Sequence, residues 1–267
     1  MFLKKLSAGL AAAASAAVMM IAVGAPSAAA DPEGQNHYYI EVGGTGSALP
    51  HPDCTSTYQA VNERLRAQGD IPVPVCYAAS FWPFIGSDNA QPAPFAPTYD
   101  ESVQDGWRNG NGDPMPSGVA ETLRVATETH RNDPSARITI VGYSQGADVA
   151  DRVLEKIANN ETEIPRELVN GKLYADPRQP ETGLWRFLPV GTHVPVIRLT
   201  SPGLGPVDFP GMEVERHCIQ TDGICDATTL EGIGGYFVQH PRYQEPGGII
   251  DRTIDTGGNG VVWHERY

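Results

Sequence analysis

The chain has 267 residues, of which 40% are hydrophobic and 19% are charged, so it can bury a sizeable core and does not have the composition of a disordered protein. This length suits one domain of the larger α/β kind and excludes a disulfide-stapled miniprotein as well as several large domains. The formal net charge of -13 opposes contact with phosphate backbones, so we expect no nucleic-acid partner.

The N-terminus has the pattern of a secretory signal peptide. A basic start at Lys4 and Lys5 precedes an uncharged stretch, residues 6–25, and small residues at 28–30 offer a cleavage site. An uncleaved membrane anchor is the alternative, but the stretch is rich in Ala, which drives membrane insertion weakly. We therefore expect residues 31–267 to be exported, to the cell envelope or beyond it.

Strand-like and helix-like segments alternate along the exported part of the chain. Hydrophobic periodicity and stop signals predict, in chain order, a strand over 37–42, a helix over 55–68, a strand over 73–78, helices over 99–108 and 117–130, a strand over 137–141, a helix over 145–158, and strands over 172–175 and 194–199. Strands separated by helices predict an α/β fold with a mostly parallel sheet and helices on both faces.

Two segments have a composition that excludes regular structure. Residues 81–97 are rich in Pro and aromatic residues, which predicts a loop suited to an acyl chain or a lipid surface. The alternative is a packed loop that covers the core. The Gly-rich residues 247–260 predict a loosely held C-terminal tail.

Four cysteines remain after export, namely Cys54, Cys76, Cys218 and Cys225. An even number in an oxidising compartment predicts two disulfides. Three pairings are possible, and the simplest joins the neighbours in sequence, Cys54 with Cys76 and Cys218 with Cys225. The spacing is not that of a zinc site, so we expect no metal.

The sequence Gly142-Tyr143-Ser144-Gln145-Gly146 has the form G-x-S-x-G. It lies between a predicted strand and a predicted amphipathic helix, which is the setting in which a serine nucleophile stands on a sharp turn. The helix N-terminus that follows offers free N–H groups to a developing oxyanion. We therefore expect Ser144 to be a nucleophile rather than part of a chance Gly-Ser-Gly turn.

A serine nucleophile needs a histidine base, and folds with this turn supply it downstream of the serine and the acid. His193 begins a predicted strand, His217 abuts a cysteine, and His264 lies in a tail end that we expect to be frayed. His240 follows an apolar segment and precedes a proline, so we expect it in a loop that delivers a buried base.

Two carboxylates compete for the role of the acid that orients the histidine. Asp222 lies between Cys218 and Cys225, and a disulfide closing so short a segment would fix its position. Asp176 follows a predicted strand, at the end where α/β enzymes bind ligands. For either residue the alternative is a loop carboxylate that accepts backbone hydrogen bonds.

The combination of Gly-Tyr-Ser-Gln-Gly, Cys-x3-Asp-x2-Cys and His-x2-Tyr resembles the cutinase family of secreted α/β hydrolases. The resemblance implies that Asp222 is the acid and His240 the base. It also implies an oxyanion hole formed by the backbone N–H of Gln145 and a group from Thr45.

Other segments are more similar to the PE-PPE domain hydrolases of actinobacteria, which share the cutinase-like core. These are residues 77–103 and 175–178, and the second also resembles the mycolyl-ester hydrolases of mycobacterial phages. The resemblance implies that residues 31–267 form a single α/β-hydrolase domain.

The resulting expectation is a secreted, monomeric serine esterase that acts on carboxylic esters of lipid or acyl type through an acyl-enzyme. This chemistry needs no cofactor, and transient contact with a lipid or cell-envelope surface is expected. Two alternatives stay open at this point. One is a non-catalytic cell-wall or lipid-binding module on a hydrolase fold, and the other is an acyltransferase, which would use the same three side chains.

Overall fold

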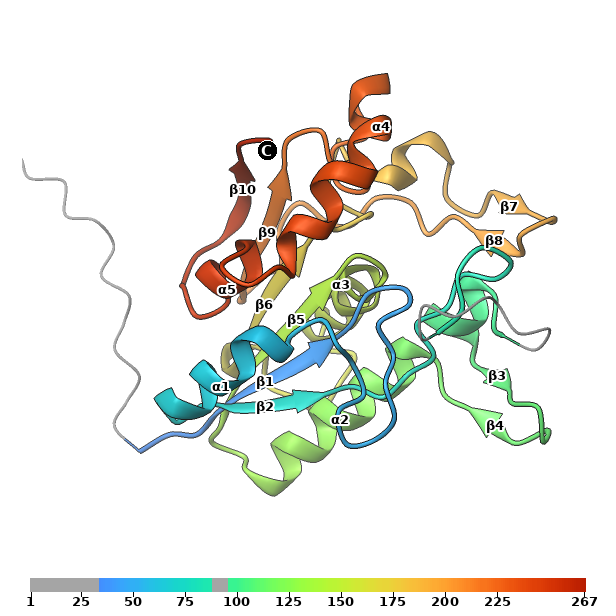
Figure 1. The fold of residues 1–267 in the computed structure, drawn as a ribbon. Helices are drawn as coiled ribbons and strands as arrows, with labels where there is room; N and C mark the ends of the chain where they lie inside the picture. The colour runs from blue at the N-terminus through green and yellow to red at the C-terminus, as the bar shows by residue number, and fades with distance from the viewer. Residues whose placement is uncertain (1–33, 88–95) are drawn as a thin grey trace, which may run out of the picture. The chain divides into compact units, whose positions relative to one another are not determined.

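The computed structural model describes residues 34–87 and 96–267. The expected signal peptide, residues 1–30, and part of the 81–97 loop lie outside the described residues. In the described part, a six-stranded sheet has the order β10-β9-β6-β5-β1-β2, and all neighbouring strands pair in parallel (Figure 1). Its strands are β1 (His37–Val42), β2 (Ile71–Pro74), β5 (Arg137–Tyr143), β6 (Val169–Tyr174), β9 (Glu213–Ile219) and β10 (Gly260–His264).

Helices cover both faces of this sheet, as expected for an α/β fold. The α-helices are α1 (Gln59–Gln68), α2 (Gly118–Asn132), α3 (Gln145–Ala158), α4 (Leu230–Gln239) and α5 (Ile249–Thr253). Side chains of α2 and α3 pack with Ile40 and Ile140 on one face, whereas α1 and α5 pack with Tyr39 and Val141 on the other. Adjacent residues of β1 and of β5 thus enter opposite cores, which is the two-residue period of a strand buried on both faces.

Local signals explain where the helices begin and end. The Ser117 hydroxyl accepts a hydrogen bond from the Ala120 N–H (3.2 Å) and caps α2. Gly69 ends α1 with φ 94°, a left-handed conformation that favours glycine. The helix predicted over 55–68 begins at Gln59 instead, because the Thr55 hydroxyl binds the Thr57 N–H and holds that stretch in a turn.

Two predicted strands differ from the structure. The strand predicted over 73–78 spans Ile71–Pro74, and the chain then leaves the sheet towards Cys76, which is bonded to Cys54. The segment 194–199 is a small antiparallel hairpin outside the main sheet, formed by β7 (His193–Val194) and β8 (Leu199–Thr200). Arg198, with φ 46°, turns the chain between these two short strands.

The helix predicted over 99–108 is a short π-helix, Glu101–Asp105. It is followed by β3 (Trp107–Arg108), which pairs with β4 (Pro114–Met115) in a second small hairpin. Gly106, with φ 74°, separates the helix from the hairpin, because this conformation cannot continue a right-handed helix.

The expectation of a loosely held tail over 247–260 is wrong. Ile249, Ile250 and Ile254 of the α5 region are buried in the core beside α1. The chain then forms β10, which pairs in parallel with β9 along the sheet edge. The apolar residues in the tail, and not its glycines, decide how it folds.

A buried carboxylate in β1 predicts that the stability of the protein depends on pH. Glu41 is fully buried, its Oε2 accepts one hydrogen bond from Asn62 Nδ2 (3.0 Å), and its Oε1 has no partner among the described residues. Burial raises the pKa of Glu41 to about 8. The folded state therefore binds the proton more tightly than the unfolded chain, whose pKa is about 4.3.

The free energy of unfolding should consequently fall as the pH rises from about 4.3 towards about 8, where the carboxylate ionises in the folded protein. Glu41→Gln removes this ionisation, and we expect it to flatten that part of the curve and to raise stability at pH 9. Urea unfolding at several pH values measures this. A pH dependence that is unchanged in the variant would contradict it.

Candidate active site

Ser144 stands at the turn between β5 and α3, at the carboxyl edge of the sheet. Its backbone has φ 57° and ψ -122°, which is strained for a residue with a side chain. The turn is possible because a Cβ atom on Gly146 would lie 2.1 Å from the Val42 carbonyl oxygen, and one on Gly142 would lie 2.3 Å from the Gly146 carbonyl oxygen. Two glycines therefore give the strand and the helix the close approach that this turn needs.

Three side chains from distant parts of the chain meet at this turn. His240 Nε2 lies 2.8 Å from Ser144 Oγ, and His240 Nδ1 lies 2.9 Å from Asp222 Oδ2 and 3.1 Å from Asp222 Oδ1. The exposed fraction is 9% for Ser144, 6% for His240 and 0% for Asp222. A serine hydroxyl, an imidazole and a buried carboxylate in this order can take a proton from the serine and stabilise the resulting imidazolium.

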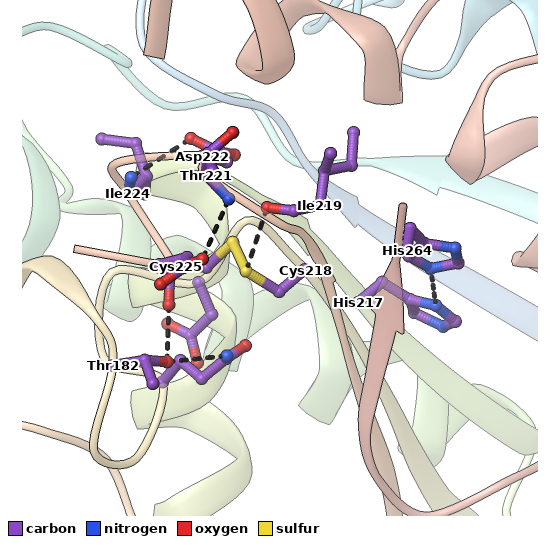
Figure 2. Close-up of a disulfide and its surroundings, with 12 residues drawn as sticks. Thr182, His217, Cys218, Ile219, Thr221, Asp222, Ile224, Cys225 and His264 are labelled. Atoms are coloured by element: carbon purple, nitrogen blue, oxygen red, sulfur yellow. Dashed lines mark hydrogen bonds between the residues drawn. A yellow bond between two sulfur atoms is a disulfide. The ribbon is translucent and has the colours of Figure 1, made fainter. Parts of the chain in front are cut away.

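Asp222 is held by a tight loop that follows β9. The Cys218–Cys225 disulfide closes the loop, and the Ile224 N–H donates to Asp222 Oδ1 at 3.1 Å (Figure 2). The Tyr243 hydroxyl accepts a hydrogen bond from the Ile219 N–H (2.6 Å) at the end of the strand. Both predicted disulfides, this one and Cys54–Cys76, are present.

Removal of the disulfide in this loop should affect activity more than stability. Cys218→Ser combined with Cys225→Ser should lower kcat strongly, because Asp222 loses its fixed position. The loss of stability should be about 2–3 kcal/mol at most, since so short a loop restricts the unfolded chain little. Steady-state kinetics and urea unfolding measure the two effects.

The matched control replaces the other pair, Cys54 and Cys76, by serine. That disulfide closes a longer loop, with a sequence separation of 22 against 7, so its removal should cost more stability and less kcat. The idea is refuted if the two double variants lose kcat equally.

Two aromatic rings stack on the imidazole of His240. Tyr143 stacks on it at 5.0 Å with an interplanar angle of 24°, and Tyr236 stacks at 4.8 Å with an angle of 29°. The Tyr143 hydroxyl also donates to the His240 carbonyl oxygen (2.6 Å). The predicted loop is in fact the C-terminal end of α4, where His240 begins a short 3-10 helix (His240–Tyr243).

Asp176, the competing acid, lies in a different buried network. Its Oδ2 accepts from Arg216 Nε (3.0 Å), and its Oδ1 accepts from the Arg178 N–H (2.9 Å). Arg216 and Arg178 also both bind Asp151, each at 2.6 Å. Burial, together with the charge of Asp151, raises the pKa of Asp176. Asp176 thus joins β6 to β9 and α3, and Asp222 is the carboxylate beside His240.

The other three histidines downstream of Ser144 have partners away from the serine. His193 Nδ1 lies 3.0 Å from the Thr200 hydroxyl across the small hairpin. His217 Nδ1 lies 3.0 Å from His264 Nε2, between β9 and β10 (Figure 2). The expectation that His264 is frayed is wrong, because it belongs to a paired strand. Burial and the neighbouring His217 lower the pKa of His264 to about 4.

The two residues expected to form the oxyanion hole, Gln145 and Thr45, line the same cavity as Ser144. Gln145 is the first residue of α3, so its backbone N–H belongs to the unpaired first turn. Its side-chain Nε2 donates to the Ser80 carbonyl oxygen (2.9 Å), which joins the turn to the loop that follows β2. Thr45 is half-buried in the loop after β1 and lines one cavity together with Ser144 and Gln145.

That cavity has a volume of about 550 Å³ and is lined mainly by apolar and aromatic side chains. One wall is a row of rings in edge contact, Phe81 with Tyr99 at 5.3 Å and Tyr99 with Trp185 at 5.5 Å. Asp148 fixes two of them, because its Oδ2 accepts from the Tyr99 hydroxyl (2.7 Å) and from Trp185 Nε1 (3.1 Å). Sequence reasoning missed Asp148, whose position in α3 resembles that of an ordinary polar helix residue.

Apolar side chains also extend from the cavity to the surface. Phe84, Phe187 and Phe237 line the cavity and are 62%, 52% and 82% exposed. Exposed apolar side chains grouped at one opening are typical of a surface that meets an apolar partner.

Within residues 34–87 and 96–267, His, Cys, Asp and Glu side chains form no group of three placed to hold a metal ion. In the same residues, no helix combines the length and the apolar composition needed to cross a membrane.

Three solved structures illustrate what this chain is similar to. The catalytic core of acetyl xylan esterase from Trichoderma reesei is 17% identical and matches 74% of this chain and 90% of its own, with a TM-score of 0.45. A cutinase-like protein from Cryptococcus sp. is 15% identical over 74% of this chain and 85% of its own, with a TM-score of 0.46. Lysin B from Mycobacteriophage D29 is 18% identical over 68% and 63%, with a TM-score of 0.41.

Sequence comparison identifies a curated relative and a family. The SL1278 acyltransferase Chp1 of Mycobacterium tuberculosis is 26% identical over 196 residues, which cover 70% of this chain and 42% of the relative. The chain therefore spans less than half the length of this relative. The PE-PPE domain model matches residues 69–259, which include most of the sheet and all three side chains at the turn. The chain belongs to the PE-PPE domain family.

Proposed function

We propose that the chain is an exported serine esterase that cleaves carboxylic esters of lipid or acyl type through an acyl-enzyme. The observation that carries the proposal is the 2.8 Å contact between His240 Nε2 and Ser144 Oγ, with Asp222 at 2.9 Å from Nδ1, beside an apolar cavity. Two disulfides and the N-terminal pattern support export. The apolar opening supports transient contact with lipid, and the enzyme acts as a monomer without a cofactor or a nucleic-acid partner.

In the proposed reaction, Ser144 Oγ attacks the ester carbonyl carbon while His240 Nε2 takes the hydroxyl proton. The backbone N–H of Gln145 and a group from Thr45 stabilise the oxyanion. The imidazolium, supported by Asp222, gives its proton to the departing alcohol. Water then attacks the acyl-enzyme, passes a proton to His240 and releases the acid, and the proton returns to Ser144 Oγ.

Acyl transfer is the second candidate, and the name of the M. tuberculosis relative favours it. The first half of the reaction is the same, because the acyl group is again bound to Ser144. An alcohol then takes the place of water in the second half. The two functions therefore use the same side chains of Ser144, His240 and Asp222, and differ in whether water or an alcohol attacks the acyl-enzyme.

Release of p-nitrophenol from p-nitrophenyl esters of increasing acyl length tests both candidates, since it reports acylation of the serine. We expect turnover together with covalent labelling by a fluorophosphonate probe. A chain that folds as described but is neither labelled nor active on any of these esters would instead be a non-catalytic binding module.

A further inference from the structure

The residues that line the cavity beside Ser144 include two groups of different origin. The ring row of Phe81, Tyr99 and Trp185 is anchored to α3 through Asp148. The second group is linked to the histidine and its acid, and consists of Ile224 from the Asp222 loop, and Tyr236 and Phe237 from α4. We call this second group, Ile224, Tyr236 and Phe237, the histidine-side face.

The two stacked tyrosines restrict how an attacking hydroxyl can reach the base. Tyr143 and Tyr236 both stack on the His240 ring, and the ring is nearly fully buried. Its Nδ1 edge is occupied by Asp222. The Nε2 edge is in contact with Ser144 Oγ, and Ser144 lines the cavity together with the histidine-side face.

The chemistry of this face discriminates between attacking hydroxyls. A water molecule is stable in a confined site when it has two to four polar partners. The histidine-side face offers only one polar side-chain group, the Tyr236 hydroxyl, because Ile224 and Phe237 have none. An alcohol with an alkyl chain can place its hydroxyl at Nε2 and its chain along Tyr236 and Phe237. Phe237 is largely exposed, so covering it removes apolar surface from water.

We propose that the histidine-side face is an acceptor site, which binds the apolar part of an alcohol and directs the acyl group to it rather than to water. The inference rests on the proposed acyl-enzyme. In the transfer step, the bond between Ser144 Oγ and the acyl carbon breaks, and a bond between the acyl carbon and the alcohol oxygen forms. The proton of the alcohol passes through His240 Nε2 to Ser144 Oγ, so that the free enzyme is restored.

The test is the partition of the acyl-enzyme between water and an alcohol. With p-nitrophenyl butyrate as donor, p-nitrophenol measures acylation, and chromatography gives the ratio of new ester to free butyrate. At equal concentrations, 1-hexanol should be preferred to methanol by about tenfold or more in the natural protein. Tyr236→Ala and Phe237→Ala should each reduce this preference, by about fivefold for the first.

The ratio of new ester to free butyrate distinguishes weaker binding of the alcohol from a weaker base. Hydrolysis and transfer both use His240, so a weaker base slows both reactions and leaves their ratio unchanged. Val238→Ala is the matched control, because Val238 lies on the same helix, is exposed, and does not line this cavity. Equal use of methanol and hexanol, or a preference retained in both variants, would overturn the acceptor site while leaving the esterase intact. If p-nitrophenol is not released at all, the esterase proposal fails and the acceptor site fails with it.

Discussion

Replacing Ser144 by alanine should reduce ester hydrolysis by about four to six orders of magnitude and leave the fold intact. The change removes the one oxygen that would carry the acyl group. His240 Nε2 then loses its partner at 2.8 Å, but the Tyr143 and Tyr236 rings still hold the imidazole. Turnover of p-nitrophenyl esters and the far-UV circular dichroism spectrum measure the two expectations.

The matched control makes the same chemical change at another serine. Ser117 caps α2 through its hydroxyl, so Ser117→Ala should cost about 1 kcal/mol of stability. It should leave kcat close to that of the natural protein, because α2 does not contribute to the cavity. Activity of the Ser144 variant within about tenfold of the natural protein would rule out Ser144 as the nucleophile.

Asp222→Asn should lower kcat by up to about 10⁴ with little change in folding. The amide keeps the size of the carboxylate, but its NH₂ group favours the wrong tautomer of His240, and it no longer stabilises the imidazolium. The measured quantities are kcat and the midpoint of urea unfolding.

Asp176→Asn is the complementary experiment, and it should lower stability more than kcat. Asp176 accepts a hydrogen bond from the buried Arg216, which keeps Asp151 as a second partner, so we expect Asp176→Asn to cost about 1–3 kcal/mol of stability. Its kcat should change much less, as long as the assay temperature stays below unfolding. A larger loss of kcat for Asp176→Asn than for Asp222→Asn, at equal folding, would transfer the role of the acid to Asp176.

The elements nearest the serine were the most predictable from sequence. The strand that ends at Tyr143 and the helix Gln145–Ala158 agree with the apolar periodicity, since both are covered by the core along most of their length. Strand β9 was missed, because its sequence Glu-Val-Glu-Arg-His-Cys-Ile is largely polar. Two of its charged side chains are buried in ion pairs, Arg216 with two aspartates and Glu215 with Lys172, and such pairs between distant residues leave no periodic signal.

In the candidate site, too, some residues could be predicted from the sequence and others could not. Short motifs pointed to Ser144, Asp222 and His240, because the turn, the disulfide spacing and the fold order are local or ordered features. The environment of the histidine was not predictable. Tyr236 comes close to His240 because both lie on one helical turn that leads into a 3-10 helix, and the sequence had indicated a loop there. The anchoring of Tyr99 and Trp185 by Asp148 depends on tertiary contacts alone.

The position of β9 within the sheet has a consequence for local unfolding. Ser144 follows β5, which lies two strands in from either edge of the sheet or further, whereas the loop of Asp222 follows β9, whose outer neighbour is the edge strand β10. The Gln220 N–H at the start of that loop donates to the His264 carbonyl oxygen of β10 (2.9 Å). Edge elements open with less free energy than central ones. Amide hydrogen exchange should therefore be faster in β10 and at Gln220 than in β5, and catalysis should be lost on partial opening of this edge while the surroundings of the serine are still folded.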